Sequence, residues 1–228
     1  MGASTIPDNL RWTVTIDDGL YQQIKTQEAF WKLVSLSRMV NALSFVHVPL
    51  KDAIDNSPAS LRIRFNAFLF AGALVYEASL RVDELGKDFR QLPEYVTLVA
   101  PFRTPEVQRL IQTNLKPMRN GAVFHFGYED VGATLSELKM HSVSFVDGVG
   151  PGVTNMHYSL ADTCAMAMFT ARGQEALDVL RPVAEILVQQ TLSLVIQFLR
   201  NAEAFIGTAL VGLGWRFVPV GAVPDASK

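Results

Sequence analysis

The stretch that decides the fold is residues 65–76, which read Phe-Asn-Ala-Phe-Leu-Phe-Ala-Gly-Ala-Leu-Val-Tyr. A helix drawn through this stretch is apolar on nearly all of its sides, and such a helix lies inside a protein core. The surrounding pattern extends the helix over residues 59–85, with Gly86 placed to end it as a C-cap. We therefore predict one long buried helix at the centre of a helical fold.

Helical patterns continue on both sides of this stretch. They cover residues 21–46, 59–85, 104–126, 158–171 and 175–210, with a shorter helix that ends at residue 138. Pro49 is expected to end the first of these helices. Thr104 is expected to cap the third, with Pro105 in its first position. Pro117 should interrupt or kink that third helix, because proline lacks the backbone donor that a helix needs.

Two segments, residues 11–16 and 141–146, alternate in polarity as strands do. The whole pattern predicts an all-α helical bundle of five or six main helices with at most one or two short strands. A chain of 228 residues forms one large domain, or one domain with an extension. We expect an N-terminal arm over residues 1–20, a helical core over residues 21–138, and a helical extension over residues 139–228 that packs on the same core.

The run of residues 116–126, Lys-Pro-Met-Arg-Asn-Gly-Ala-Val-Phe-His-Phe, carries the most chemistry in the chain. It brings Arg119, Asn120 and His125 within two helical turns. A guanidinium binds phosphate through a planar fork of donors, and an imidazole transfers protons near neutral pH. On a regular helix Arg119 and His125 lie ~120° apart around the axis and ~9 Å apart along it, so they do not share one stripe. These residue types suit cleavage of a phosphodiester bond in RNA without a metal.

This pattern of arginine, a polar residue, four residues and then histidine resembles the signature of the HEPN-domain family, many of whose members are ribonucleases. The resemblance covers residues 22–138 at most, and only the motif is specific. It implies a HEPN-like helical core with a C-terminal helical extension, and a two-fold dimer in which two Arg–His pairs line one cleft. It also implies a cyclic-phosphate product.

The charges of these residues suggest their roles: Arg119 is expected to hold the scissile phosphate and to stabilise the charge that develops on it. His125 acts as general base on the ribose 2′-hydroxyl, or as acid on the leaving 5′-oxygen. Asn120 orients His125 or the phosphate through its amide. A plainer, structural interpretation stands beside this one: Arg119 in a surface ion pair, Asn120 as a helix cap, and His125 half-buried in the core.

Glu77 lies in the apolar centre of the predicted buried helix, where a carboxylate must be paired or neutral. One option is a pair with Arg81, four residues further along the same helix. This is the plainer of the two options. The other is that Glu77 reaches Arg119 and supports it from behind the candidate site.

Charge and cysteine usage exclude several classes of protein. The formal net charge of -2 leaves no global basic footprint of the kind that a nucleic-acid coating protein has, although a local basic cleft stays open. Cys164 is the only cysteine, which excludes an intrachain disulfide and a cysteine-rich zinc site. His141 and His157 lack acidic or thiol partners at metal-ligand spacing, so we expect no metal and no cofactor.

Hydrophobic residues make up 49% of the chain, which prompts a search for membrane segments. The charge-free runs at 65–76, 186–199 and 204–215 hold twelve, fourteen and twelve residues. A spanning helix needs about 20 predominantly apolar residues. We therefore expect no membrane segment, and the N-terminal residues do not form a signal-peptide pattern, which favours a cytoplasmic protein. The surplus of apolar side chains then predicts a subunit interface, most simply that of a homodimer.

Two functions of different classes follow. The first is a HEPN-like, metal-independent endoribonuclease or RNA-binding protein of a defence or toxin type, with an antitoxin or regulatory partner. The second is a catalytically silent, dimeric helical protein that binds a ligand or another protein. The position of His125 in the dimer separates them, because the nuclease needs two copies of this side chain across one two-fold cleft.

Overall fold

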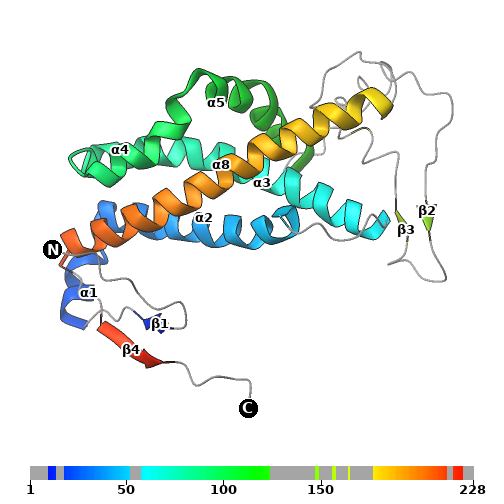
Figure 1. The fold of residues 1–228 in the computed structure, drawn as a ribbon. Coiled ribbons are helices and arrows are strands. Elements are labelled where there is room, and N and C mark those ends of the chain that lie inside the picture. The colour runs from blue at the N-terminus through cyan, green and yellow to red at the C-terminus, as the bar shows by residue number, and fades with distance from the viewer. Residues whose placement is uncertain are drawn as a thin grey trace.

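A computed structural model describes residues 10–13, 18–51, 58–123, 147–148, 156–157, 164, 177–214 and 218–222. Side chains are described over residues 18–51, 60, 63–120, 164 and 185–214. Within these residues the chain is a bundle of long helices with short strands at its edges (Figure 1). The predicted all-α helical bundle is confirmed.

Three long helices form the body of the described bundle: α2 (Glu28–Lys51), α3 (Pro58–Phe89) and α8 (Leu177–Gly212). The shorter helical elements are α1 (Asp18–Ile24), α4 (Pro93–Val99), η1 (Ala100–Arg103), α5 (Pro105–Leu110), η2 (Ile111–Leu115) and η3 (Met118–Val123). Figure 1 shows α2 along one side of the bundle and α4 to α5 along the other.

The strands among the described residues are short and pair in two antiparallel ribbons. Strand β1 (Leu10–Thr13) pairs with β4 (Val218–Ala222), which joins the two ends of the chain. Strand β2 (Asp147–Gly148) pairs with β3 (Met156–His157). The expected strand over residues 11–16 therefore overlaps β1. The strand expected over 141–146 lies outside the described residues, as do the helix expected to end at 138 and nearly all of the one over 158–171.

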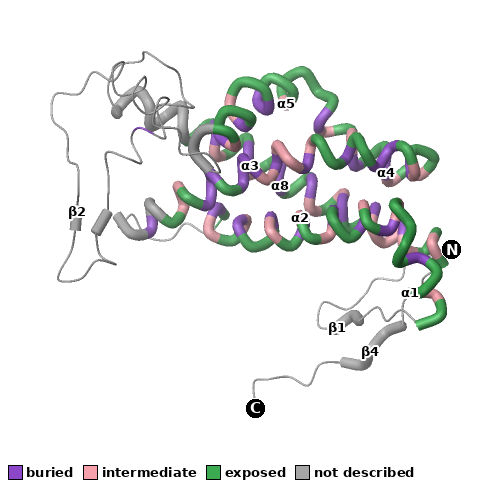
Figure 2. The backbone as a smooth tube through the Cα atoms, turned by 180° about the vertical axis from the view of Figure 1, so that it is seen from behind, coloured by how far each residue is buried: buried purple, intermediate pink, exposed green. Residues whose placement is uncertain are grey.

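Helix α3 occupies the centre of the bundle, as residues 65–76 predict. It contacts α2, α8, α4, η2 and η3. Its residues Ala71, Ala73 and Val75 are 0% exposed, and Phe68 is 1% exposed. Burying a phenylalanine side chain stabilises the fold by about 1.5–3 kcal/mol. The small alanines around it let neighbouring helices approach closely, although Asn66 and Phe70 of the same stretch stay exposed. Figure 2 shows buried residues along the centre of α3.

The C-terminal helix α8 shares this core. Phe205 on α8 contacts the rings of Phe89 and Tyr95, with centroid separations of 5.4 and 6.2 Å. Phe198, two turns earlier, contacts Phe102 at 5.9 Å. The edge-to-face and tilted geometries are those that aromatic pairs prefer. These contacts attach α8 to the end of α3, to α4 and to η1.

The single helix expected over residues 21–46 is two helices. Helix α1 ends at Ile24 and α2 begins at Glu28. The carbonyl of Lys25, between them, accepts a 2.6 Å hydrogen bond from the indole of Trp31. Pro49 does not end α2, as was expected, but lies in its last turn. Its missing N–H removes the one helical hydrogen bond that would reach the carbonyl of Phe45, and α2 ends two residues later at Lys51.

Gly86 does not end the central helix, because α3 continues through it to Phe89. A Cβ atom at Gly86 would collide with the hydroxyl of Tyr95 on α4. The expected C-cap is therefore a packing position. Glycine is needed there because it has no side chain at the point where the hydroxyl comes closest.

The expectation of no membrane segment is wrong. Three helices, Glu28–Lys51, Ile63–Phe89 and Glu185–Gly212, are long and apolar enough to cross a membrane, by length and composition. Counting charge-free runs ended each segment at its first ionised residue. A spanning helix tolerates one or two such residues, whose long side chains reach the membrane interface. The cytoplasmic location stays a prediction.

Candidate functional site

The segment that carries the motif begins at Thr104. The hydroxyl of Thr104 accepts a 3.3 Å hydrogen bond from the backbone N–H of Val107, and Pro105 is the first residue of α5. Proline suits this position because its missing N–H would have no partner in the first turn of a helix. The predicted start of this helix is confirmed.

Past Leu110 the helical path widens into two π-helical segments, η2 and η3, with Pro117 between them. The N–H of Lys116 donates to the carbonyl of Ile111, five residues back. A proline ring in a regular helix clashes with the carbonyl four residues earlier, and a wider turn relieves that clash. The interruption expected at Pro117 is thus a local change from α-helical to π-helical hydrogen bonding, and the chain continues as a helix. Such π turns are rare, and they are frequent at functional sites.

The segment that carries Arg119 and Asn120 packs on α3 at Gly72. Leu115 and Met118 are both 0% exposed. A Cβ atom at Gly72 would collide with the sulfur of Met118 and would lie 3.3 Å from Cδ2 of Leu115. Sequence reasoning did not assign Gly72 a role, although a glycine inside an otherwise apolar helix usually has a packing reason. Here it sets how closely η3 approaches α3.

One residue beyond Met118, Arg119 forms an ion pair with Glu77 of α3. The distance from Nε of Arg119 to Oε1 of Glu77 is 2.8 Å, and the two side chains are 34% and 23% exposed. Nη1 of Arg119 also donates to Oδ1 of Asn120 at 3.1 Å. Glu77 and Asn120 therefore hold the guanidinium on different edges. Its plane and position are defined before any ligand arrives.

The plainer option for Glu77 is wrong. Arg81 pairs with Glu84, three residues further along α3, at 2.9 Å, and both of these side chains are 48% exposed. Glu77 pairs instead with Arg119, which was the other option given by the sequence. The only sequence signal was that a carboxylate in an apolar stretch needs a partner. Which cation supplies it depends on where η3 packs.

The structure brings together three of the four candidate residues, Glu77, Arg119 and Asn120. His125 lies outside the described residues, so its roles stay predictions. Among the described residues, no group of three His, Cys, Asp or Glu side chains gathers as a metal site would require. Cys164 is 3% exposed, and burial raises the pKa of its thiol. A buried thiol of this kind is a core residue with little nucleophilic character.

Comparison of the chain with protein-family models, with curated proteins and with solved structures finds no match.

Proposed function

We propose that the protein is a metal-independent endoribonuclease of the HEPN type, in which Arg119 binds the scissile phosphate and His125 transfers protons. The observation that supports this is the geometry of Arg119: Glu77 and Asn120 hold its guanidinium, and its side chain stays partly exposed. The ion pair alone is also what the structural interpretation expects. A guanidinium already held by a carboxylate and an amide loses little rotational freedom when a phosphate binds, so its hydrogen bonds are preorganised. At 34% exposure, the Arg119 side chain is also within reach of a ligand from solvent.

The proposed reaction is an in-line displacement at phosphorus. His125 removes the proton of the ribose 2′-hydroxyl as that oxygen attacks, and the bond from phosphorus to the 5′-oxygen breaks. The 5′-oxygen takes up a proton from an imidazolium, which leaves a cyclic phosphate and a 5′-hydroxyl. Arg119 stabilises the negative charge that grows on the phosphate oxygens. A two-fold homodimer would supply the second imidazole, so that one acts as base and the other as acid.

Glu77 has a defined place in this proposal. Its carboxylate offsets part of the positive charge of Arg119, so phosphate binding depends more on the geometry of the guanidinium fork than on charge alone. Lysine cannot reproduce that fork, because an ammonium is a point charge on a flexible stem. Arg119→Lys should therefore lose cleavage although the charge is kept.

The test is cleavage of single-stranded RNA by the purified full-length protein in the presence of a chelator. His125→Ala should reduce the rate ~10²-fold or more, because proton transfer is lost. Arg119→Lys should reduce it by about tenfold or more. Arg109→Lys is the matched control: this arginine is exposed, lies ten residues earlier on the same helical path, and should cleave as the wild type does.

The opposite result would identify a catalytically silent helical protein that binds a ligand or another protein. In that case the wild type cleaves no RNA of a broad panel, and His125→Ala lowers the melting temperature because the ring is packed in the core. A melting temperature measured for every variant separates the two, since loss of cleavage with an unchanged melting temperature supports catalysis.

A further inference from the structure

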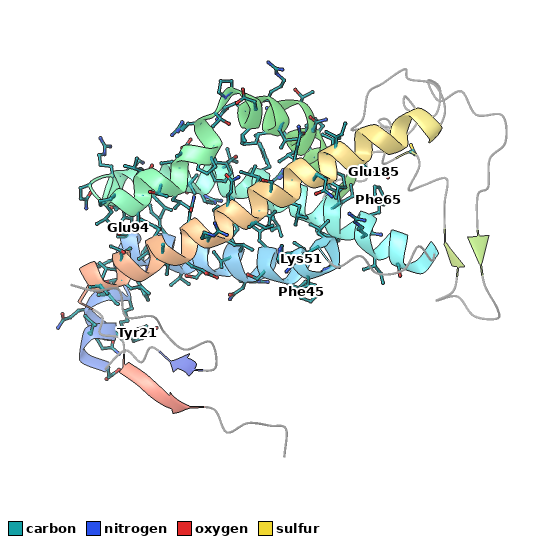
Figure 3. The ribbon with its side chains drawn as sticks, viewed as in Figure 1. Tyr21, Phe45, Lys51, Phe65, Glu94 and Glu185 are labelled. Atoms are coloured by element: carbon teal, nitrogen blue, oxygen red, sulfur yellow. The ribbon has the colours of Figure 1, made fainter. Side chains whose placement is uncertain are left out.

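The outer face of α2 is unusually apolar for an exposed helix surface. We define it by Trp31, Val34, Phe45 and Val48, whose exposed fractions are 55%, 52%, 79% and 55%. At 100° per residue these four side chains fall within a stripe of ~100°. The opposite side of α2 is buried against α3 and α8 (Figure 2). Phe45 points away from both of those helices (Figure 3).

Trp31 suits contact with an apolar phase. Its indole N–H donates to the backbone carbonyl of Lys25 at 2.6 Å. The polar atom of the side chain is therefore satisfied inside the protein, while the ring stays 55% exposed. Transfer of this ring from water to an apolar environment breaks no hydrogen bond and leaves no donor without a partner.

The charged side chain within this stripe is a cation. Arg38 lies within the stripe, and Lys25, whose carbonyl accepts the hydrogen bond of Trp31, lies just before α2; both are exposed. The sole acidic residue of α2 is Glu28, and its carboxylate is bound to Lys32 at 2.9 Å. The outer face of α2 thus combines large apolar side chains with cations, which complements the anionic headgroups of a lipid surface.

Other exposed helix surfaces have a different character. The exposed residues of α8 mix apolar Ile186, Ile196 and Val211 with Gln189, Gln190, Gln197, Arg200 and Glu203. Those of the C-terminal part of α3 include Leu80 among Arg81, Asp83, Glu84 and Lys87. Both signs of charge and many amides occur there. Of these surfaces, the outer face of α2 is therefore the one best suited to contact a membrane.

We propose that the outer face of α2 docks on the surface of an anionic lipid bilayer, with α2 lying in the plane of the membrane. Phe45, Val48, Val34 and the ring of Trp31 enter the boundary between headgroups and acyl chains, while Arg38 and Lys25 contact lipid phosphates. Helix α2 keeps its contacts with α3 and α8. This inference is independent of the proposed ribonuclease activity.

A second copy of the chain fits this face less well than lipid. In a two-fold contact between antiparallel α2 helices, Arg38 lies near the middle of the helix and so meets Arg38 of the other copy. Two guanidinium groups in a desolvated apolar contact repel each other. At an anionic lipid surface the same group is paired with phosphate.

The experiment is flotation of the full-length protein with vesicles of phosphatidylcholine alone and of phosphatidylcholine mixed with phosphatidylserine. Binding is expected to the mixed vesicles, and added salt should weaken it. Phe45→Ser/Val48→Ser should reduce binding ~10-fold or more, because two exposed apolar side chains are removed without touching the core. Arg38→Glu should also reduce binding. The matched control is Val96→Ser/Ile186→Ser, which removes side chains of 59% and 57% exposure from α4 and α8.

A second readout follows Trp31 directly. The chain has three tryptophans, so Trp12→Phe/Trp215→Phe leaves Trp31 as the sole indole. Its emission should shift to shorter wavelength with mixed vesicles. The proposal is overturned by any of three results: equal binding of wild type and Phe45→Ser/Val48→Ser, a dimer without lipid that this double variant dissociates, or protein in cell membranes that only detergent releases, which would show spanning helices.

Discussion

Nε of Arg119 donates to Oε1 of Glu77 at 2.8 Å, which joins the motif segment η3 to the central helix α3 across 42 residues of sequence. Both side chains are partly buried, so each has lost some of its contact with water. Such a pair contributes more to the stability of the fold than an ion pair on the surface does, because solvent screens it less. It also connects the chemistry of the motif to the packing of the core.

The first prediction concerns the energy of this pair. In a double-mutant cycle with Glu77→Gln and Arg119→Gln, we expect a coupling free energy of about 1 kcal/mol from urea unfolding. Glu84→Gln and Arg81→Gln form the control cycle, because that pair is exposed and lies on one helix. Its coupling should be about 0.3–0.5 kcal/mol or less. Couplings of equal size in the two cycles would show that the Glu77–Arg119 pair is an ordinary surface contact.

The second prediction concerns Gly72. Gly72→Ala should destabilise the protein by about 1–3 kcal/mol, because the added Cβ collides with Met118 and nothing in the packed core can yield without cost. It should also lower RNA cleavage if the proposed activity is correct, since η3 must shift. Unfolding in urea measures the first effect and the chelator-resistant assay the second.

Gly212 provides the control for this change. A Cβ atom at Gly212 meets nothing within 4 Å, and the residue is the last of α8. Gly212→Ala should therefore leave stability unchanged or raise it by as much as about 1 kcal/mol, because the unfolded chain loses conformational freedom. If Gly72→Ala is as well tolerated as Gly212→Ala, the close approach of η3 to α3 is not required.

The third prediction concerns Tyr95 and high pH. Burial raises the pKa of the Tyr95 hydroxyl above its ordinary value of 10.0, with a smaller contribution from the nearby Asp83. The folded state therefore holds the phenol proton to higher pH than the unfolded state does. Stability from this group is complete below pH ~10 and is lost as the pH rises from there through the folded pKa.

Tyr95→Phe isolates the effect, because it keeps the ring beside Phe205 and removes the titrating hydroxyl. The unfolding free energy of this variant should fall less steeply above pH ~10 than that of the wild type. Tyr21→Phe is the control, since the Tyr21 ring is 43% exposed. Identical slopes for wild type and Tyr95→Phe would show that the hydroxyl is solvated in the folded protein.

The local features of the fold were predictable because their causes lie within a few residues of one another. Residues 65–76 form a buried helix because they offer no polar face to water. Thr104 and Pro105 start a helix because a side-chain acceptor and a residue without an N–H suit its first turn. The boundaries were less predictable. The division between α1 and α2 involves the indole of Trp31, six residues away, and Gly86 is set by Tyr95 on another helix.

The candidate site shows the same division. Arg119 and Asn120 were identified from the sequence because their chemistry is a property of the residue types and their spacing. The partner of Glu77 was not, because a carboxylate on α3 can meet Arg81 locally at little cost, and only the packing of η3 on Gly72 brings Arg119 within 2.8 Å.

By itself the sequence determined that this protein is a helical bundle built around one apolar helix, and that an arginine, an amide and a histidine lie together in one segment. The tertiary structure alone decided which side of α2 stays exposed and which cation pairs with Glu77. It also decided that the long apolar helices continue beyond the ionised residues that end their charge-free runs. The physical reason is that burial and ion pairing depend on neighbours distant in the chain. Periodicity and capping depend only on neighbours along it.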